Sequence, residues 1–427
     1  MTATAEAGSE TVTDLAEEVM FSDPFPRYAE LRRVAPVSRV VSKQLVRSGG
    51  YMLTRYDDVL QLYSDPRFSS DLMGQGKPGV VRYLPRAVRM LLDSMVYKDD
   101  PDHARLRRLV NRAFTPRRVS EMSGHIQRIV DELLAALEIR GAIDLVAEFA
   151  VPLPLAVISS MLGVSDEERA RFHSLTSRFV SGVGSGSLYE FARVLPTAQK
   201  LLKLIERMSE DRRASPDEGL ITALVVAGED GDALSPDEIS AMIFLLMLAG
   251  HDTTANLIGS SILTLLDHPE QADRWREDGA LTTSAVEELL RFTTPVPCGT
   301  TRMATEDVVI GGTTIRKGTN LLGMIISANR DETVFERPDE LDLGREPNRH
   351  ITFAFGKHYC LGNQLARMEG QIAIRTLVQR YPDMRLAVPA DQLRYKPTQS
   401  LRGLRSLPLR FGSAAPVGES HRSSVTG

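Results

Sequence analysis

A capped and almost uninterrupted apolar segment in the middle of the chain limits the possible folds most strongly. Ser235-Pro236-Asp237-Glu238 combines an N-cap serine, a proline at the first helical position and a glutamate at the third, which predicts a capping box. The sequence stays compatible with a helix to about Leu266, and His268-Pro269 ends it. A helix of roughly 30 residues is about 45 Å long. Because this one is apolar on nearly all sides, we expect it to cross the protein interior.

Four polar residues, His251-Asp252-Thr253-Thr254, interrupt this helix near its centre. Polar side chains in apolar surroundings cost free energy unless they find hydrogen-bond partners. The quartet therefore indicates either a set of buried partners or a functional site on the helix.

Other segments predict a mainly α fold with small β sheets. Val40 to Thr54 contains β-branched and aromatic runs, and Asp102 to about Leu290 is mostly helical in pattern. Val308-Val309-Ile310 and Thr313-Thr314-Ile315 flank Gly311-Gly312, a pattern typical of a β-hairpin. The length would suit two or three domains. Because no linker, low-complexity tract or repeat divides the chain, we expect one domain.

Composition excludes several functional classes. Lys and Arg total 51 and Asp and Glu 56, a formal net charge of −5, so the basic surplus of a nucleic-acid-binding protein is missing. The longest apolar run, Ala241 to Ala249, is shorter than the roughly 18 residues of a membrane span. The acidic N-terminus does not resemble a secretory signal, and two cysteines cannot form a disulfide framework. We expect a soluble cytoplasmic protein with a flexible leader at 1–18, a domain at 19–412 and a disordered tail at 413–427.

A cysteine between two glycines is the clearest chemical signal in the chain. Cys360 lies between Gly356 and Gly362, just before a helix predicted to begin near Leu361. Backbone N–H groups at a helix N-terminus lower a thiol pKa, and flanking glycines let the backbone approach a metal or cofactor closely. By itself the pattern fits either a thiolate ligand or a small buried cysteine at a turn.

This segment resembles the haem-binding loop of cytochrome P450 enzymes, Phe-x-x-Gly-x-x-x-Cys-x-Gly. Phe353, Gly356, Cys360 and Gly362 meet the pattern, whereas Ala354 stands where many members have a second glycine. Further motifs follow in the order typical of the family: Asp100 to Arg107, Ala249 to Thr254, Glu288 to Arg291, and Pro338 to Arg345. The resemblance covers roughly residues 20–412.

The resemblance implies a cytochrome P450 fold with a single haem domain that binds haem b, iron protoporphyrin IX. It makes Cys360 the axial ligand of the iron, and a thiolate ligand supplies electron density that favours O–O cleavage. His103 and Arg107 lie four residues apart, so they share one helix face and can reach the same haem propionate. Arg302 and His358 match the other propionate contacts of the family. By itself, His103 would be read as a surface histidine.

The resemblance also assigns roles on the long helix. Gly250 lets the helix pass close to the haem face, and Thr253 bonds either to the carbonyl of Ala249 or to dioxygen. Asp252 relays protons inward as the acid beside this alcohol. A purely structural salt bridge is the alternative for Asp252. His251 is assigned no chemistry and is expected to make helix-surface contacts.

Two further groups are expected to be structural. Glu288 and Arg291 should bond each other and Arg345, and this triad would support the cysteine loop rather than take part in catalysis. Cys298 is expected to be a small residue of an apolar site.

The segments nearest the haem predict a lipophilic substrate. Leu245, Ala249, Val296 and Leu401 are the expected substrate contacts, with variable loops near 68–97 and 172–195. Residues 182–187 are rich in glycine and serine and fit either the hinge of a lid or a plain loop.

The expected activity is insertion of one atom of dioxygen into such a substrate, by hydroxylation or epoxidation, in microbial natural-product tailoring. By resemblance to soluble bacterial members, the electrons come from a ferredoxin and a ferredoxin reductase. The candidate docking cations are Arg105, Arg108, Arg112, Arg117, Arg118 and Lys357. The alternatives are a catalytically silent homologue that activates a partner enzyme and a peroxide-driven hydroxylase. The presence of Cys360, Asp252 and Thr253 weighs against both.

Overall fold

The fold is that of a computed structural model of the whole chain. It describes residues 12–15, 17–42, 46–71, 86, 89–90, 93–137, 141–184, 188–226 and 234–412. Most of the predicted leader, the tail at 413–427 and much of the loop at 68–97 lie outside the described residues.

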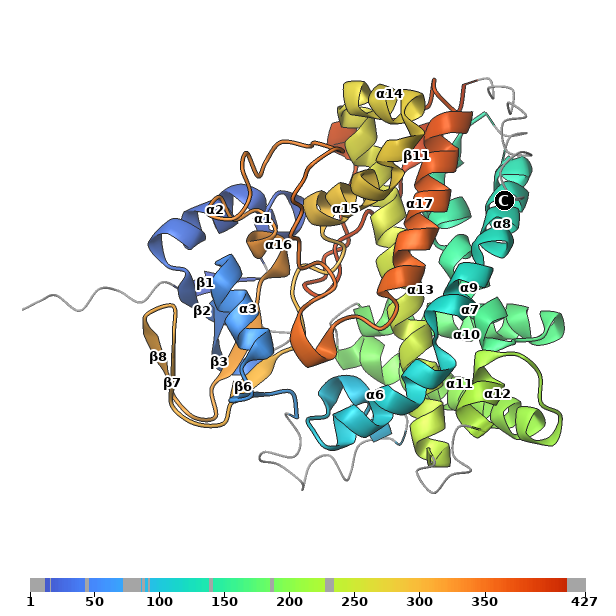
Figure 1. The fold of residues 1–427 in the computed structure, drawn as a ribbon, viewed down its shortest axis with the longest axis horizontal. Coiled ribbons are helices and arrows are strands. Elements are labelled where there is room, and N and C mark those ends of the chain that lie inside the picture. The colour runs from blue at the N-terminus through green and yellow to red at the C-terminus, as the bar shows by residue number, and fades with distance from the viewer. Residues whose placement is uncertain are drawn as a thin grey trace, which may run out of the picture.

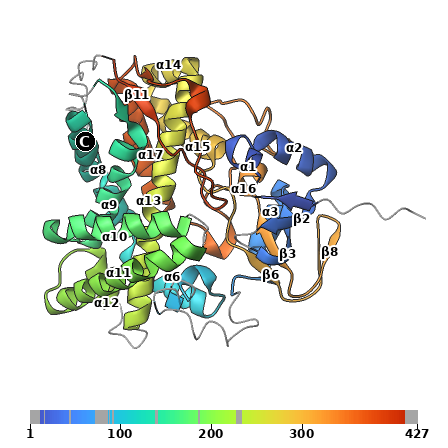
Figure 2. The same cartoon turned by 180° about the vertical axis from the view of Figure 1, so that it is seen from behind.

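Helices form the larger part of the molecule; the largest sheet and the β7–β8 hairpin lie to one side of them, whereas β11 lies near α14 and α17 (Figures 1 and 2). The longer helices are α2 (Phe25–Val34), α3 (Tyr56–Ser64), α6 (Asp102–Ala113), α8 (Ser123–Leu137), α9 (Pro152–Leu162), α10 (Asp166–Gly184), α11 (Leu188–Ala214), α13 (Pro236–Asp267), α14 (Pro269–Glu277), α15 (Thr282–Thr293) and α17 (Asn363–Arg380). Shorter ones are α1 (Val19–Ser22), α7 (Pro116–Glu121), α12 (Leu220–Val226), α16 (Ile325–Ala328), η1 (Met95–Tyr97), the π-helical turn η2 (Val146–Ala150), η3 (Gly279–Leu281), η4 (Gly356–His358) and η5 (Ala390–Gln392).

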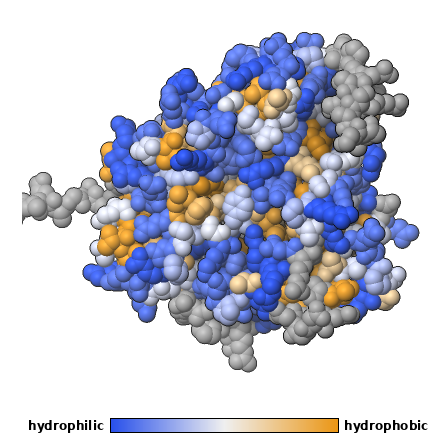
Figure 3. Space-filling model, viewed as in Figure 1, coloured by the Kyte–Doolittle hydropathy of each residue, from blue (hydrophilic) through white to orange (hydrophobic). Residues whose placement is uncertain are grey.

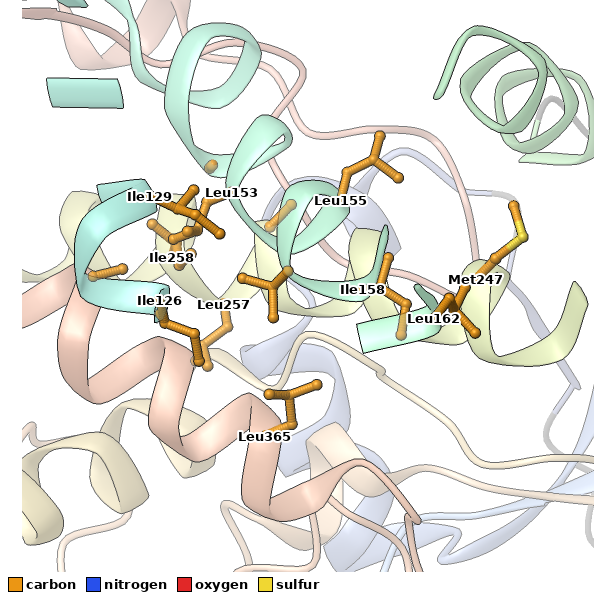
Figure 4. Close-up of a cluster of buried hydrophobic side chains, with 14 of the residues drawn as sticks. Ile126, Ile129, Leu153, Leu155, Ile158, Leu162, Met247, Leu257, Ile258 and Leu365 are labelled. Atoms are coloured by element: carbon orange, nitrogen blue, oxygen red, sulfur yellow. The ribbon is translucent and has the colours of Figure 1, made fainter. Parts of the chain in front are cut away.

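Helix α13 is the predicted central helix. Ser235 accepts a hydrogen bond from the Glu238 N–H and Glu238 bonds back to the Ser235 N–H, so the capping box is confirmed. His268 is the C-cap, as the sequence predicts. The helix packs against α9, α11, α15 and α17, so it crosses the interior. Figure 4 shows one part of this contact, where Ile158 of α9, Leu257 of α13 and Leu365 of α17 face a common apolar cluster.

The β structure consists of three small sheets. The largest has the strand order β1-β2-β3-β9-β6-β4. Its strands are β1 (Val12–Asp14), β2 (Val37–Ser42), β3 (Val46–Leu53), β9 (Asn320–Gly323), β6 (Arg302–Ala304) and β4 (Phe68–Ser69). The second contains β10 (Arg385–Leu386), β11 (Pro408–Arg410) and β5 (Ile143–Asp144), and the third is the predicted hairpin of β7 (Val308–Ile310) and β8 (Thr313–Ile315).

The leader differs from the expectation for residues 1–18. Val12–Asp14 forms β1, which pairs in parallel with β2 through Val12 and Arg39. Three residues have too weak a pattern to predict a strand from sequence, and the backbone of β2 supplies the pairing.

Helix α13 is also long and apolar enough, by length and composition, to cross a membrane, although no single run in it predicts this. About 56% of its most apolar window is buried inside the protein, which fits a core helix. The surface in Figure 3 is mostly hydrophilic, with apolar residues scattered in small patches.

The proposed lid hinge at 182–187 is only partly described. Residues up to Gly184 belong to α10, α11 begins at Leu188, and residues 185–187 lie outside the described part of the chain. The first half of the expected hinge is therefore helical.

Candidate active site

A cavity of about 630 Å³ lies between α13 and the cysteine loop. Helix α13 contributes one wall and α6 another, and η1, α17 and the segments 295–302 and 400–401 also line the cavity. Predicted residues on its lining are His103, Arg107, Leu245, Ala249, Gly250, Thr253, Val296, Arg302, His358, Cys360 and Leu401. Segments far apart in the sequence therefore meet at one site.

The cysteine loop has an unusual backbone that holds Cys360 at the cavity. The Cys360 N–H donates to the Phe353 carbonyl over 2.9 Å, which closes the loop. Gly356 has φ +73°, and a side chain there would come within 2.4 Å of the Tyr63 carbonyl oxygen. Ala354 has φ +61°, in the left-handed region that glycine adopts more easily. The loop thus takes its shape with alanine at this position.

The thiol of Cys360 does not have the lowered pKa that the sequence predicts. Burial raises its pKa, while the Gly362 N–H and the charges of Arg107 and Arg367 act in the opposite direction. The prediction considered only the loop amides and could not weigh the loss of water around the sulfur. A metal that binds this sulfur would displace its proton.

Cationic and imidazole groups gather at one edge of the cavity. The rings of His103 and His358 lie 4.1 Å apart, and His358 Nε2 lies 2.9 Å from Ser70 Oγ. Burial and the neighbouring Arg302 and His103 lower the pKa of His358 to about 3. His103 is 3% exposed rather than a surface histidine, and burial and Arg107 lower its pKa.

Some of these groups lack partners within the protein. His103 Nε2 is buried and makes no hydrogen bond to any described residue. Arg107 forms no ion pair in the described part of the chain, and Arg302 donates to Thr300 Oγ1 over 2.5 Å and lies over the Tyr63 ring. Two guanidinium groups and the His103 Nε2, which has no described hydrogen-bond partner, are suited to carboxylates of a bound molecule at this cavity edge.

Helix α13 presents Thr253 and Gly250 to the cavity. The Thr253 hydroxyl donates to the Ala249 carbonyl over 2.8 Å, which confirms the predicted bond. A side chain at Gly250 would touch only Ile158, at an ordinary distance of 3.7 Å. Packing of the protein alone therefore does not require this glycine.

Asp252 and His251 lie away from the cavity lining, and His251 differs from its prediction. Its side chain is 2% exposed, and its Nδ1 lies 2.9 Å from the Met247 carbonyl oxygen. The expected helix-surface contact is wrong because this face of α13 is covered. Asp252 is also buried, with Oδ1 3.6 Å from His251 Nε2 and 3.9 Å from Lys396 Nζ.

The predicted buried triad is present. Arg291 donates two hydrogen bonds of 2.7 Å to Glu288, and Arg345 Nε donates to the same carboxylate over 3.0 Å. Arg291 also donates to the Asn329 carbonyl, and the Asn329 side chain bonds Ile351 N and Thr352 Oγ1. This chain of contacts ends directly before Phe353, so the triad supports the cysteine loop.

Two lining residues were not predicted to face the cavity. Cys298 is buried in apolar surroundings, as expected, and its Sγ lies 3.6 Å from the Gln399 carbonyl oxygen. It also lines the cavity, which was not expected. Glu369 of α17 lines it too, its Oε2 has no described hydrogen-bond partner, and burial raises its pKa to about 8. The sequence signal that could have identified Glu369 is its position, an acidic residue among apolar ones on the helix after Cys360.

Several of the candidate docking cations form ion pairs within the protein. Arg105 pairs with Glu238, Arg117 with Glu121 and Lys357 with Asp100. The side chain of Arg112 lies outside the described residues. An open groove of about 610 Å³ beside the cysteine loop is lined by Asp100, His103, Ala104, Arg107, Arg108, Asn111 and Lys357.

Comparison with known proteins identifies the family. The profile described as Cytochrome P450 matches residues 74–382. The protein named Cytochrome P450 107B1 of Saccharopolyspora erythraea is 39% identical over 94% of this chain and 100% of its own. The solved structure of the Bacillus subtilis bacillaene polyketide synthase cytochrome P450 PksS has a TM-score of 0.85 at 36% identity, covering 93% of this chain and 99% of that one. The structure of the myxobacterial cytochrome P450 CYP267B1 in complex with myristic acid has a TM-score of 0.86, also at 36% identity, covering 93% and 98%.

The fold and the matches define a haem-dependent monooxygenase with a mainly α architecture. The chain belongs to the cytochrome P450 family.

The groups at the cavity fit the haem cofactor that this family implies. The site offers a sulfur ligand, two guanidinium groups and a buried imidazole nitrogen without a described hydrogen-bond partner, which match the iron and the two propionates. The rest of the lining is largely apolar and suits the porphyrin faces and a lipophilic substrate.

Proposed function

We propose that the chain binds haem b through Cys360 as the axial ligand and through His103, Arg107, Arg302 and His358 as propionate contacts. The observation that carries this proposal is that all five side chains line one cavity. Once bound, haem with a thiolate ligand supplies the reductive activation of dioxygen and the oxidising power for attack on a C–H or C=C bond.

The protein's own part in the reaction is to hold and move protons on α13. The Thr253 hydroxyl rests on the Ala249 carbonyl and can turn from it into the cavity. Asp252 directly precedes Thr253 and carries the acid that restores the proton of this hydroxyl. Gly250 keeps the cavity wall between Ala249 and Thr253 free of bulk.

The substrate is a lipophilic molecule without a charge in the portion that enters the cavity. Leu245, Ala249, Val296 and Leu401 form its expected contacts, and the acidic and basic side chains of the described lining gather on α6, α17, Arg302 and His358. Burial of apolar surface therefore supplies most of its affinity. The polyketide context of PksS, similar to this chain, makes a natural product the proposed substrate class.

Electron supply is proposed to come from a ferredoxin and a ferredoxin reductase, in the cytoplasm. The open groove beside the cysteine loop carries Arg107 and Arg108, which offer positive charge to an acidic donor, whereas Lys357 there pairs with Asp100. Both alternatives remain disfavoured: the silent homologue because Cys360 and Thr253 are present, and the peroxide-driven enzyme because Asp252 accompanies Thr253.

A substrate screen tests this function directly. The haem-loaded protein is titrated with a panel of macrolides, terpenoids and fatty acids, including myristic acid, and the spin-state change of the iron is recorded. Hits are then incubated with NADPH, a ferredoxin and its reductase, and the products are examined for one added oxygen from labelled dioxygen. Label derived only from water, or no oxygenated product from any hit, contradicts the proposal.

A further inference from the structure

A buried serine outside the cavity lining contacts one of the imidazoles that line it. Ser70 directly follows strand β4 and is 2% exposed, and its Oγ lies 2.9 Å from Nε2 of His358. The other ring nitrogen of His358, Nδ1, has no hydrogen-bond partner in the described part of the chain. Because His358 lines the cavity, Nδ1 is the nitrogen left for a bound carboxylate.

The half-buried Asp99 holds this serine in place. The two oxygens of its carboxylate accept the Ser70 N–H, over 2.9 Å, and the Ser69 hydroxyl. Burial raises the pKa of Asp99, but these hydrogen bonds lower it by more, so the carboxyl stays ionised near neutral pH. The carbonyl of Asp99 also accepts the His103 N–H over 2.9 Å. Asp99 therefore links the segment that carries Ser70 to the first turn of α6.

The contact at Nε2 decides which nitrogen of His358 carries the hydrogen. A neutral imidazole has a hydrogen on one nitrogen and a lone pair on the other. The Ser70 hydroxyl bonds to no other described group, so it can donate to a lone pair on Nε2. The hydrogen of the ring then lies on Nδ1, where a carboxylate can accept it. The opposite tautomer would turn a lone pair toward the carboxylate and repel it.

The second imidazole at this cavity edge, His103, lacks such a contact. Its Nδ1 lies 3.7 Å from Asp100 Oδ1, which is too long for a hydrogen bond, and its Nε2 has no described partner. The rings of His103 and His358 lie 4.1 Å apart. Of these two rings, His358 is therefore the one whose nitrogen is held by a hydrogen bond within the described residues.

We propose that Ser70 is a positioning residue that fixes the tautomer of His358 and so presents its Nδ1–H to a haem propionate. The serine acts through the imidazole and does not itself contact the propionate. A hydrogen bond from His358 offsets part of the propionate charge, which strengthens haem binding and raises the haem reduction potential. This inference rests on the role proposed above for His358.

Ser70→Ala is the decisive variant, because it removes the hydroxyl at Nε2 and little else. Haem transfer from the loaded protein to excess apomyoglobin should become about tenfold faster, since the propionate loses a donor. The propionate bending band in the resonance Raman spectrum should shift to lower wavenumber, and the reduction potential should fall. Ser70→Thr keeps a hydroxyl and should preserve all three properties.

Ser69→Ala is the matched control. Ser69 is 3% exposed and its hydroxyl bonds the same Asp99 carboxylate, but it makes no described contact with His358. The variant should leave the Raman band and the reduction potential unchanged, whatever it costs in stability. Equal shifts in Ser69→Ala and Ser70→Ala would show that the segment, and not the hydroxyl at Nε2, controls the propionate, and would overturn the proposal.

A double-mutant cycle tests whether Ser70 acts through His358. His358→Asn keeps an N–H near the position of Nδ1 but has no nitrogen near Nε2. In this background Ser70→Ala should not accelerate haem transfer further, because the group that it positions is gone. An equal acceleration in both backgrounds contradicts the proposal.

A second pair of variants covers the case in which Ser70→Ala does not fold. His358→Gln places its amide near the position of Nε2, whereas His358→Asn places it near Nδ1. We expect slower haem transfer from His358→Asn, since its donor lies on the side of the propionate. Slower transfer from His358→Gln would reverse the assigned tautomer and refute the inference.

The ferrous carbonyl spectrum separates this inference from the proposed function. If the unchanged protein forms the thiolate-type spectrum and Ser70→Ala matches it in Raman band, reduction potential and haem transfer, the role of Ser70 is refuted. If the unchanged protein lacks that spectrum, the proposed function itself fails.

Discussion

The hydroxyl of Thr253 donates a 2.8 Å hydrogen bond to the carbonyl oxygen of Ala249, one turn earlier on the central helix. That carbonyl belongs to a helix whose own ladder already uses it, so the added bond is weak and exchangeable. The hydroxyl lines the cavity opposite Cys360 and can therefore act as a movable donor.

Removing this hydroxyl should uncouple the enzyme. In Thr253→Ala we expect NADPH consumption to continue while product per NADPH falls several-fold and hydrogen peroxide appears, because proton delivery in the cavity loses its donor. Thr253→Ser keeps the hydroxyl and should retain most of the coupling. Equal product yields in Thr253→Ala and the unchanged protein would remove the proposed role.

The left-handed conformation of Ala354 should cost stability. With φ at +61°, Ala354→Gly relieves strain in the folded loop but adds freedom to the unfolded chain. We expect the free energy of unfolding to rise by about 0.5–1 kcal/mol. Ala354→Val should lower it, since a β-branched residue tolerates positive φ poorly. Urea denaturation of the three proteins measures the order, and a more stable valine variant would contradict it.

The buried triad should be costly to break. Arg291→Met leaves the fully buried Glu288 with Arg345 as its one described cationic partner, so we expect a loss of about 3–5 kcal/mol in unfolding free energy. The matched control is Glu340→Gln, which breaks another i,i+3 pair, with Arg337, on the surface. That change should cost less than about 1 kcal/mol. Similar losses of unfolding free energy in both variants would show that burial does not determine how much an ion pair contributes to stability.

Glu369 should make stability depend on pH. Burial raises its pKa from 4.5 to about 8, so the folded protein holds this proton more tightly than the unfolded chain. Stability therefore falls as pH rises from about 4.5 to about 8, and the penalty is complete above the folded pKa. Glu369→Gln should flatten this fall. Denaturation midpoints at several pH values measure this fall. An identical dependence of the midpoint on pH in Glu369→Gln would show that Glu369 does not cause it.

Sequence patterns predict the parts of this molecule that local rules control. The capping box at Ser235, the end of α13 at His268 and the hairpin around Gly311-Gly312 depend on residues close in the chain. The convergence of Cys360 with Thr253 came from motif resemblance, because no local rule reports that two distant segments meet.

The features that sequence missed depend on packing between distant segments. His251 looked like a surface residue because nothing in its helix shows that this face of α13 is covered. The pKa of the Cys360 thiol is raised rather than lowered, because burial, which the sequence does not report, outweighs the effect of the loop N–H groups. Glu369 was overlooked because an acid on α17 reads as a solvent contact until the fold buries it.

The reduced, carbon monoxide-bound spectrum of the haem-loaded protein tests the central claim most directly. With Cys360 as the thiolate ligand, the unchanged protein should show the strongly red-shifted Soret band of a haem-thiolate carbonyl. Cys360→Ser should lose that band, while Cys298→Ser should keep it. A red-shifted band that persists in Cys360→Ser would contradict the assignment of Cys360 as the iron ligand.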